Sequence, residues 1–414
     1  MKRSCAAALF FAVLSAACES GVLPPVRLSA DEVGSPAAVD SGEPFLSSAG
    51  DTVFMSWLGR SASGVRQMRF ARYVGGTWEE PSVVTEGERL LVNVADFPSV
   101  VPAPDGSLWA HWLQRDANGR GYGVRVTRSE DGGSTWSEPW IPHQDGTPTD
   151  HGFVSTVPLD GAMGLLWLDG RAFAPATGGA ATGGAPTMET ALYFRIAGAD
   201  GPVSAEAPLD LRVCDCCQTD AAVTSRGPVL VYRDRSPEEI RDIRVTRYEN
   251  GSWGESRLVH EDGWETGACP INGPAVAAQG EDVAVAWFTA ADEESRVNVA
   301  FSDDAAGSFG RPTRVDDGNP AGRVDVVLMS DGSALVSWLE RTVGDGAEVR
   351  VRRVGPAGER LEALGVSGPT SERAMGFPRL APVGGDAIIV AWTDGAQTIP
   401  QVRVTRIEIE VEEP

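Results

Sequence analysis

Apolar and polar positions along the chain alternate in short runs, and helical periodicity is nearly absent. Seven of the apolar runs end in an aromatic residue. They end at Trp57, Trp112, Trp167, Tyr232, Trp287, Trp338 and Trp392, which lie 51 to 65 residues apart. Alternation with a period of two is the pattern of a half-buried strand. Such even spacing predicts a repeated unit rather than one irregular domain.

Each apolar run is followed by a second alternating segment, such as "VRQMRFARY" after Trp57 or "VNVAFS" after Trp287. A turn and a further strand come next, as in "GGTWEEPSVV", and an apolar stretch such as "DFPSVV" opens each unit. Four strands in roughly 50 residues describe a β-propeller blade. We therefore predict an all-β fold, a single β-propeller of four-stranded blades. The count is seven, or six if one unit is an insertion.

The last unit stops after its third strand, at "QVRVTRIEIE" (401–410). The segment "PPVRLSADEV" (24–33) resembles the strand that follows the first unit's tryptophan. We predict that this N-terminal segment supplies the missing fourth strand and leaves the ring without an open edge. The propeller would then span residues 24–410.

One turn between strands carries a recognisable pattern. "SEDGGSTW", from Ser129 to Trp136, matches the Asp-box pattern Ser-x-Asp-x-Gly-x-Thr-Trp, and "SDDAAGSF", from Ser302 to Phe309, is a degenerate copy. The aspartate can accept backbone N–H bonds inside a tight hairpin, and glycine permits positive φ. The chain thus resembles the sialidase-like, Asp-box (BNR-repeat) propeller superfamily. It is also similar to bacterial secreted propellers with a "CDCCQTD" segment.

This resemblance implies a sialidase-type glycoside hydrolase as one function. Sialidases of the family use an arginine triad, a Tyr–Glu nucleophile pair and an Asp acid/base, and they have six blades. Their Arg-Ile-Pro motif is absent here; the nearest string, "FRIA", starts at Phe194. Tyr232 with Glu239 offers a nucleophile pair, although the place of Tyr232 in its strand favours a core position. Hydrolysis is therefore the alternative rather than the first hypothesis.

Charge and the N-terminus set the expected environment. A net charge of −23 and a pI near 4.6 argue against nucleic acid or an anionic membrane surface as a partner. Residues 1–17 resemble a secretory signal peptide, with a basic start and an apolar middle. "LSAAC" resembles a lipobox, which predicts acylation of Cys18 and a short linker over 18–23; plain cleavage after Ala17 is the alternative. We expect an exported, monomeric bacterial protein in the periplasm or on the outer membrane.

The unusual loops fall on one face of the predicted ring, opposite the Asp boxes. They are the segments 141–151, 167–190, 211–220, 232–242 and 260–273. Loops on one face of a rigid scaffold commonly carry function. The candidate acid/base or nucleophilic residues are Asp169, Asp220, Asp234 and Glu239. The candidate ligand-binding residues are Arg171, Arg233, Arg235, Arg241, Trp264 and His151. A solvated salt-bridged loop, and a tryptophan packed on its neighbour, are the structural alternatives.

Four cysteines are expected to meet on this face: Cys214, Cys216, Cys217 and Cys269. Two disulfides are one interpretation, with a bridge from Cys216 or Cys217 to Cys269, because adjacent cysteines are poor partners for each other. A copper or zinc site, with His151 or His143 as further ligands, is the second, and a redox-active pair is the third. The sequence thus predicts a propeller that binds a glycan, a small anion or a metal on this face.

Overall fold

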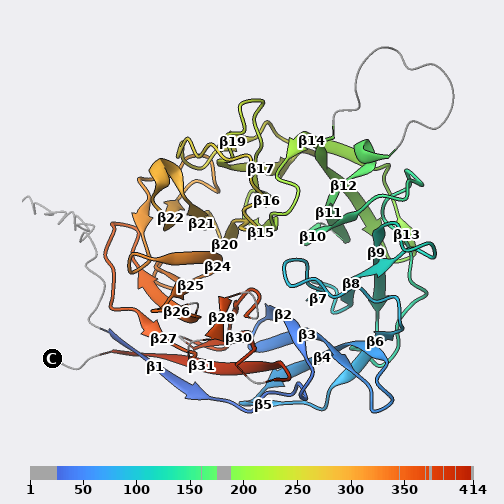
Figure 1. Ribbon diagram of the computed structural model, residues 1–414, viewed down its shortest axis with the longest axis horizontal. Coiled ribbons are helices and arrows are strands. Elements are labelled where there is room, and N and C mark those ends of the chain that lie inside the picture. Colours follow the sequence, from blue (N-terminus) through green and yellow to red (C-terminus); the bar gives the residue numbers. More distant parts are fainter. Residues whose placement is uncertain are drawn as a thin grey trace, which may run out of the picture.

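The computed structural model describes residues 26–411, except 160, 175–187, 345, 369, 373–374, 386 and 397. The predicted signal peptide, Cys18 and residues 175–187 of the predicted loop 167–190 lie outside the described residues. The described residues form seven antiparallel sheets arranged in a ring (Figure 1). This confirms the all-β fold and the count of seven blades. Within the described part of the chain, no helix has the length and apolar character needed to cross a membrane.

The blades follow one another along the chain. Blade 1 holds β2 (Gly42–Ala49), β3 (Thr52–Arg60), β4 (Arg66–Val74), β5 (Thr77–Trp78) and β6 (Ser82–Glu86); blade 2 holds β7 (Ser99–Pro102), β8 (Leu108–Arg115) and β9 (Tyr122–Ser129). Blade 3 holds β10 (His151–Leu159), β11 (Ala162–Asp169), β12 (Thr190–Gly198), β13 (Gly201–Pro202) and β14 (Ala207–Val213), with the short helix η1 (Arg171–Phe173). Blade 4 holds β15 (Asp220–Thr224), β16 (Gly227–Arg233), β17 (Ile243–Glu249), β18 (Ser252–Trp253) and β19 (Arg257–Leu258).

The remaining blades repeat this plan. Blade 5 holds β20 (Ala275–Gln279), β21 (Asp282–Thr289), η2 (Ala291–Glu293), β22 (Arg296–Ser302) and β23 (Thr313–Arg314). Blade 6 holds β24 (Pro320–Leu328), β25 (Ala334–Arg341), β26 (Gly346–Val354), β27 (Leu364–Gly365) and β28 (Thr370–Ser371). Blade 7 holds β29 (Arg379–Pro382), β30 (Ile388–Asp394), β31 (Gln401–Val411) and the N-terminal β1 (Val26–Glu32).

The outer strand departs from the predicted four-stranded plan in several blades. In blades 1, 3, 4 and 6 it is interrupted, so two short strands pair with the same third strand. In blade 2 it shrinks to a single bridge between Val126 and Trp140. Pro139 and Pro142 flank Trp140 and lack the N–H groups that would extend the ladder.

Ring closure occurs as predicted. β1 pairs antiparallel with β31, in a register that runs from Val26 opposite Val411 to Glu32 opposite Thr405. The two ends of the described chain therefore lie in one blade, and β1 covers the edge that β31 would otherwise expose (Figure 1).

The hydrophobic core is divided among the interfaces between blades. In the part of the chain that the structure describes, there are seven apolar clusters, one for each pair of neighbouring blades. The aromatic residue of each second strand packs against the preceding blade: Trp57 lies beside Ile389 of blade 7, for example, and Trp392 beside Val351 of blade 6. The regular spacing of the aromatic residues in the sequence therefore reflects the interface between neighbouring blades, which recurs once per blade.

The two turns that resemble Asp boxes form the expected hairpins. Asp131 accepts hydrogen bonds from the backbone N–H of Thr135 (2.8 Å) and from its hydroxyl (2.7 Å). Asp304 makes the equivalent bonds to Ser308. Ala306, in place of a glycine, adopts φ 61°. Both turns lie at one end of the ring, the turn face. The opposite end, the loop face, holds the segments predicted to be functional.

We predict that closure by β1 supports the stability of the whole ring. Leu28 is 8% exposed and packs between blades 6 and 7, whereas Arg27 points to solvent. Leu28→Ala should lower the free energy of unfolding by about 2–4 kcal/mol, the usual cost of truncating a buried leucine. Arg27→Ala should change it by under about 0.5 kcal/mol. Denaturant unfolding measures both, and equal effects would contradict the packing of β1.

Candidate functional site

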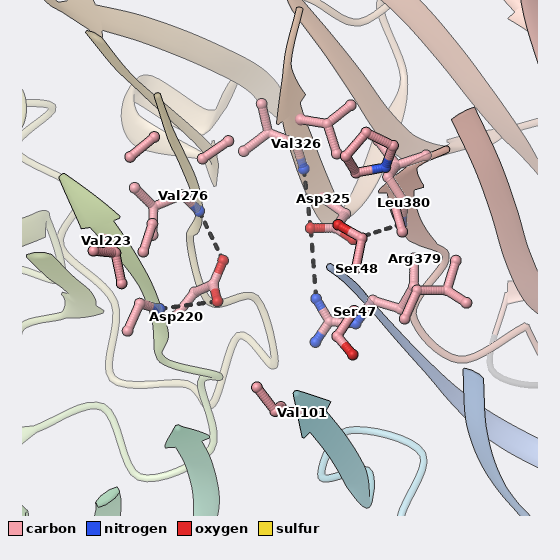
Figure 2. Close-up of a pocket in the computed structure, with 18 of the residues that line it drawn as sticks. Ser47, Ser48, Val101, Asp220, Val223, Val276, Asp325, Val326, Arg379 and Leu380 are labelled. Carbon is pink, nitrogen blue, oxygen red and sulfur yellow. Dashed lines mark hydrogen bonds and ion pairs between the residues drawn. The ribbon is translucent and has the colours of Figure 1, made fainter. Parts of the chain in front are cut away.

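An axial cavity runs along the innermost strands of the propeller (Figure 2). It has a volume of about 580 Å³. Hydroxyl, carboxyl and guanidinium groups line it together with small apolar side chains. The polar lining includes Ser47, Ser99, Ser155, Thr219, Asp220, Asp325 and Arg379. Of these, Asp220 was predicted from the sequence.

Asp220 and Asp325 hold neighbouring blades together while they border the cavity. Asp220 accepts the backbone N–H of Val276 in blade 5 (2.8 Å), and Asp325 accepts that of Leu380 in blade 7 (2.8 Å). Burial raises the pKa of Asp220 to about 7, and the nearby charge of Asp325 adds to the effect. Burial also raises the pKa of Asp325. Near neutral pH the carboxyl group of Asp220 is therefore partly protonated and can donate as well as accept hydrogen bonds.

Aromatic side chains fill the axis at the loop-face end of the cavity. Phe45, Phe97 and Phe377 form an aromatic plug: the ring centroids of Phe97 lie 5.8 Å from those of Phe45 and 6.0 Å from those of Phe377. Gln218 of blade 4 donates to the carbonyl of Ala95 beside blade 2 (2.6 Å) and so bridges the loops above. At the turn-face end, the lining residues Gln279, Ser330, Pro382 and Gly385 are exposed. The cavity therefore opens on the turn face.

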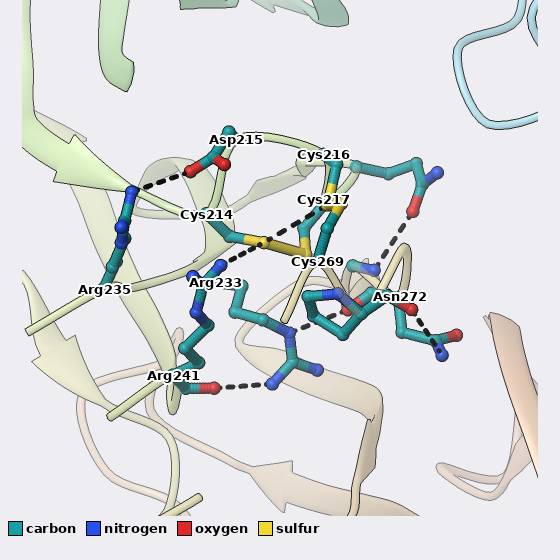
Figure 3. Close-up of a disulfide and its surroundings, with 12 residues drawn as sticks. Cys214, Asp215, Cys216, Cys217, Arg233, Arg235, Arg241, Cys269 and Asn272 are labelled. Atoms are coloured by element: carbon teal, nitrogen blue, oxygen red, sulfur yellow. Dashed lines mark hydrogen bonds and ion pairs between the residues drawn. A yellow bond between two sulfur atoms is a disulfide. The ribbon is translucent and has the colours of Figure 1, made fainter. Parts of the chain in front are cut away.

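On the loop face, the four cysteines form two disulfides, Cys214–Cys217 and Cys216–Cys269 (Figure 3). The predicted convergence and the predicted bridge to Cys269 are both confirmed. A sulfur in a disulfide is not a thiolate, so these cysteines do not supply copper or zinc ligands in this state. The second bridge ties the loop entering blade 4 to the loop entering blade 5.

The arginines of the loop face are paired with carboxylates. Glu239 lies within 3.0 Å of guanidinium nitrogens of Arg212, Arg235 and Arg241. The hydrogen bond from Arg235 is the main cause that lowers the pKa of Glu239 to about 2. Asp215 takes a second nitrogen of Arg235 at 3.1 Å. The predicted site residues Arg235, Glu239 and Arg241 thus meet, and the carboxylate of Glu239 pairs with both arginines in a salt-bridged network.

Other predicted residues have structural contacts. Arg233 is buried, donates to the carbonyls of Asn272 (2.8 Å) and Phe288 (2.6 Å), and stacks on Trp264 at 4.9 Å. Trp264 is only 8% exposed and also packs on Phe288, so its ring faces the core.

The predicted acid Asp234 and the predicted nucleophile Tyr232 also have protein partners. Asp234 pairs with Arg244 at 3.2 Å. The hydroxyl of the buried Tyr232 donates to Asp210 (2.9 Å), not to Glu239.

Asp169, Arg171 and His151 belong to a separate cluster in blade 3. Arg171 binds Asp169 through Nε and Nη2, each at 2.7 Å, and its Nη1 donates to Glu206 at 2.8 Å. His151 Nε2 lies 3.0 Å from Asp145 Oδ1 and 3.6 Å from Asp169 Oδ1. Burial disfavours the imidazolium form of His151, but pairing with Asp145, the charge of Asp169 and the hydrogen bond to the Thr149 carbonyl together outweigh burial and raise the pKa of His151.

His143, Asp145 and His151 are close enough to act as three metal ligands. However, the two imidazole rings stack at 3.8 Å with an interplanar angle of 4°, so their lone pairs lie in parallel planes and do not converge on one ion. Arg171 Nη2 also lies 3.8 Å from Asp145 Oδ1 and supplies positive charge. This arrangement suits an ion-pair network better than a bound cation.

One pocket of about 560 Å³ opens on the loop face, here called the loop-face pocket. It combines aromatic and aliphatic walls with polar groups. Its lining comprises Arg120, Tyr122, Pro148, Thr149, Asp150, Gly152, Phe153, Leu168, Gly170, Phe173, Thr190 and Asp215. Phe173 of η1 is 37% exposed, and the guanidinium of Arg120 makes no hydrogen bond or ion pair with any described residue.

Comparisons with known proteins establish the fold and leave the activity open. No protein-family model and no curated protein matches the chain. A structure of a protein of unknown function from Dyadobacter fermentans is 13% identical, with a TM-score of 0.50, and covers 94% of this chain and 100% of its own. A lectin from Burkholderia pseudomallei is 12% identical, with a TM-score of 0.55, over 88% and 96% of the two chains.

An α-L-arabinofuranosidase from Fusarium graminearum also matches, with 12% identity and a TM-score of 0.47, over 89% of this chain and 92% of its own. This similarity is too distant to support an argument about the fold or the function. The chain therefore has the fold of a seven-bladed β-propeller, as the sequence predicted.

Two residues of the axial cavity were missed by the sequence analysis. Asp325 and Arg379 occupy the same register position in blades 6 and 7 that Asp220 occupies in blade 4: each lies opposite the residue that precedes the second-strand aromatic. Aligning the seven units on that aromatic would have shown this, because the same position in the other blades holds Phe45, Ser99, Ser155 and Ala275.

We predict unequal contributions from the two disulfides. Cys216–Cys269 closes a loop with a sequence separation of 53, whereas Cys214–Cys217 closes one of only 3. On chain entropy alone, replacing the first pair with serines should cost about 4 kcal/mol of stability and replacing the second about 2 kcal/mol. Thermal unfolding of the two double variants tests this order. Mass spectrometry of unreduced digests checks the pairing, and a Cys217–Cys269 link would contradict it.

Proposed function

We propose that this protein is a binding propeller that holds a neutral glycan in the loop-face pocket. The observation that carries the proposal is the composition of that pocket, in which Tyr122 and the exposed Phe173 lie among Asp150, Thr149 and Arg120. Apolar sugar faces pack on aromatic rings, and sugar hydroxyls exchange hydrogen bonds with carboxyl, hydroxyl and guanidinium groups. The lectin from Burkholderia pseudomallei serves as an example of this use of the fold.

A neutral ligand fits this face better than an anion. The five loop-face arginines Arg171, Arg212, Arg235, Arg241 and Arg244 are each within 3.2 Å of a carboxylate oxygen. A ligand carboxylate or sulfate would have to displace one of these partners or pair with Arg120, which lies in the pocket together with the carboxyl groups of Asp150 and Asp215.

Hydrolysis is the alternative function. Asp169, Asp234 and Glu239 are engaged in ion pairs, and Asp220 borders the axial cavity instead. In the loop-face pocket, burial raises the pKa of Asp150, which makes its carboxyl the strongest acid/base candidate there. A screen with fluorogenic glycosides, including a sialoside, decides between the functions. Turnover that Asp150→Asn abolishes would replace binding by catalysis as the function.

The binding proposal predicts a specific loss of affinity. Phe173→Ala should weaken binding of glycans selected on an array by about tenfold, equivalent to about 1.4 kcal/mol, because an exposed aromatic platform is removed. Val343→Ala is a matched control, since Val343 is an exposed apolar residue of blade 6. Equal affinities for the two variants, or an array without any bound glycan, would contradict the proposal.

Export with a lipid anchor is part of the proposal and rests on the sequence of residues 1–18. If Cys18 is acylated, Cys18→Ser should move the protein from the membrane fraction to the soluble fraction of the cells. Immunoblots of fractionated cells measure this. Membrane association that survives the substitution would exclude Cys18 as the anchor.

A further inference from the structure

The axial cavity contains a cationic side chain with unused hydrogen-bonding capacity. Arg379 is 7% exposed, and none of its guanidinium nitrogens makes a hydrogen bond to a described residue. Its nearest anionic partner is Asp325 Oδ1, 3.6 Å from Nη1. Buried guanidinium groups ordinarily have their N–H groups satisfied, because leaving them unpaired is costly.

The orientation of Arg379 is determined by the aromatic plug. The guanidinium carbon lies 4.0 Å from the ring centroid of Phe97 and 5.2 Å from that of Phe45. The rings of Phe45 and Phe97 cover the face of the guanidinium, so the N–H groups at its edge remain available to a ligand. Figure 2 shows Arg379 beside Asp325, with Asp220 on the far side of the cavity. A planar fork of donors held in this way matches a carboxylate, which accepts two parallel N–H bonds.

The rest of the lining suits an acid the size of a sugar. The volume of about 580 Å³ lies within the usual range for small-molecule sites. Asp325 already lies 3.6 Å from Nη1 of Arg379, and both Asp325 and Asp220 are held by backbone N–H groups, so neither can move closer to Arg379 without giving up contacts between blades. The flanking inner strands β10 and β20 contribute Ser155, Thr156 and small apolar residues to the lining.

We propose that the axial cavity is a second binding site, distinct from the loop-face pocket, which takes a small hydroxylated carboxylic acid from the turn face and pairs its carboxylate with Arg379. The plug of Phe45, Phe97 and Phe377 closes the route from the loop face. The ligand therefore enters between the exposed turns that contain Gln279, Ser330 and Gly385.

Isothermal titration calorimetry of the protein with glucuronate tests the site. Glucuronamide is the control, because it has the same sugar ring but a neutral amide in place of the carboxylate. Glucuronate should bind saturably and at least about tenfold more tightly than the amide, since the charge-assisted fork is lost in the amide. Arg379→Met should remove that preference. Arg379→Lys, which keeps the charge without the fork, should retain an intermediate part of it.

Two further variants locate the site and separate it from the proposed glycan site. Ser330→Trp places a bulky ring at the exposed outlet and should weaken glucuronate binding without touching Arg379. It also remains informative if Arg379→Met fails to fold. Phe173→Ala, in the loop-face pocket, should leave glucuronate binding unchanged. In the wild-type protein, glucuronate binding without any bound glycan on the array would therefore reject the proposed function alone.

Binding should also strengthen as the pH falls. Arg379 keeps its charge, while Asp220, whose carboxyl group lines the same cavity, takes up a proton and ceases to repel the ligand; burial and the charge of Asp325 raise its pKa. Because the pKa of Asp220 is about 7, affinity should rise several-fold between about pH 8 and about pH 6.

Three results would overturn the proposal. These are no saturable glucuronate binding up to about 10 mM, wild-type affinity in Arg379→Met, and binding that is sensitive to Phe173→Ala but not to Ser330→Trp.

Discussion

Packing between neighbouring blades is the interaction on which the rest of the structure depends. A four-stranded sheet of this composition is apolar on both faces, and it becomes stable only when a neighbour covers each face. The aromatic residue of each second strand fills the interface with the preceding blade. Such an arrangement has no natural end, so the chain closes into a ring. β1 completes blade 7 and makes the last interface equivalent to the others.

Ring closure also explains why carboxyl groups line the axial cavity. Inner strands of neighbouring blades do not pair through a backbone ladder, so side chains take over part of that role. Asp96 accepts the N–H of Phe153, Asp220 that of Val276, and Asp325 that of Leu380. These contacts join blades 2 and 3, 4 and 5, and 6 and 7. The carboxyl groups that secure the scaffold therefore also set the charge of the cavity that the scaffold encloses.

The repeat architecture was predictable from the sequence because it depends on local patterns. The aromatic-ended strands specified seven units, and the missing fourth strand specified closure by the N-terminus. The convergence of Cys269 with Cys216 followed from the same blade order. Each of these inferences needs the order of strands and no side-chain geometry.

The candidate site was less predictable, since it depends on which partner each side chain meets. Arg233 and Glu239 both stand in a polar loop, yet Arg233 is buried against backbone carbonyls while Glu239 joins three arginines. Trp264 lies in a loop by sequence and packs in the core. Arg379 and Asp325 come from strands that look like ordinary core segments, and only closure of the ring brings them to one cavity.

We infer that the ring encloses a polar cavity, closed by Phe97 and its neighbours on the loop face, in which Arg379 binds an acidic ligand. A crystal structure of the protein grown with glucuronate tests this most directly. We expect seven blades, an intact plug, and the ligand carboxylate within about 3 Å of two nitrogens of Arg379. An Arg379 side chain hydrogen-bonded to protein groups, with the ligand absent from the axis, would contradict it.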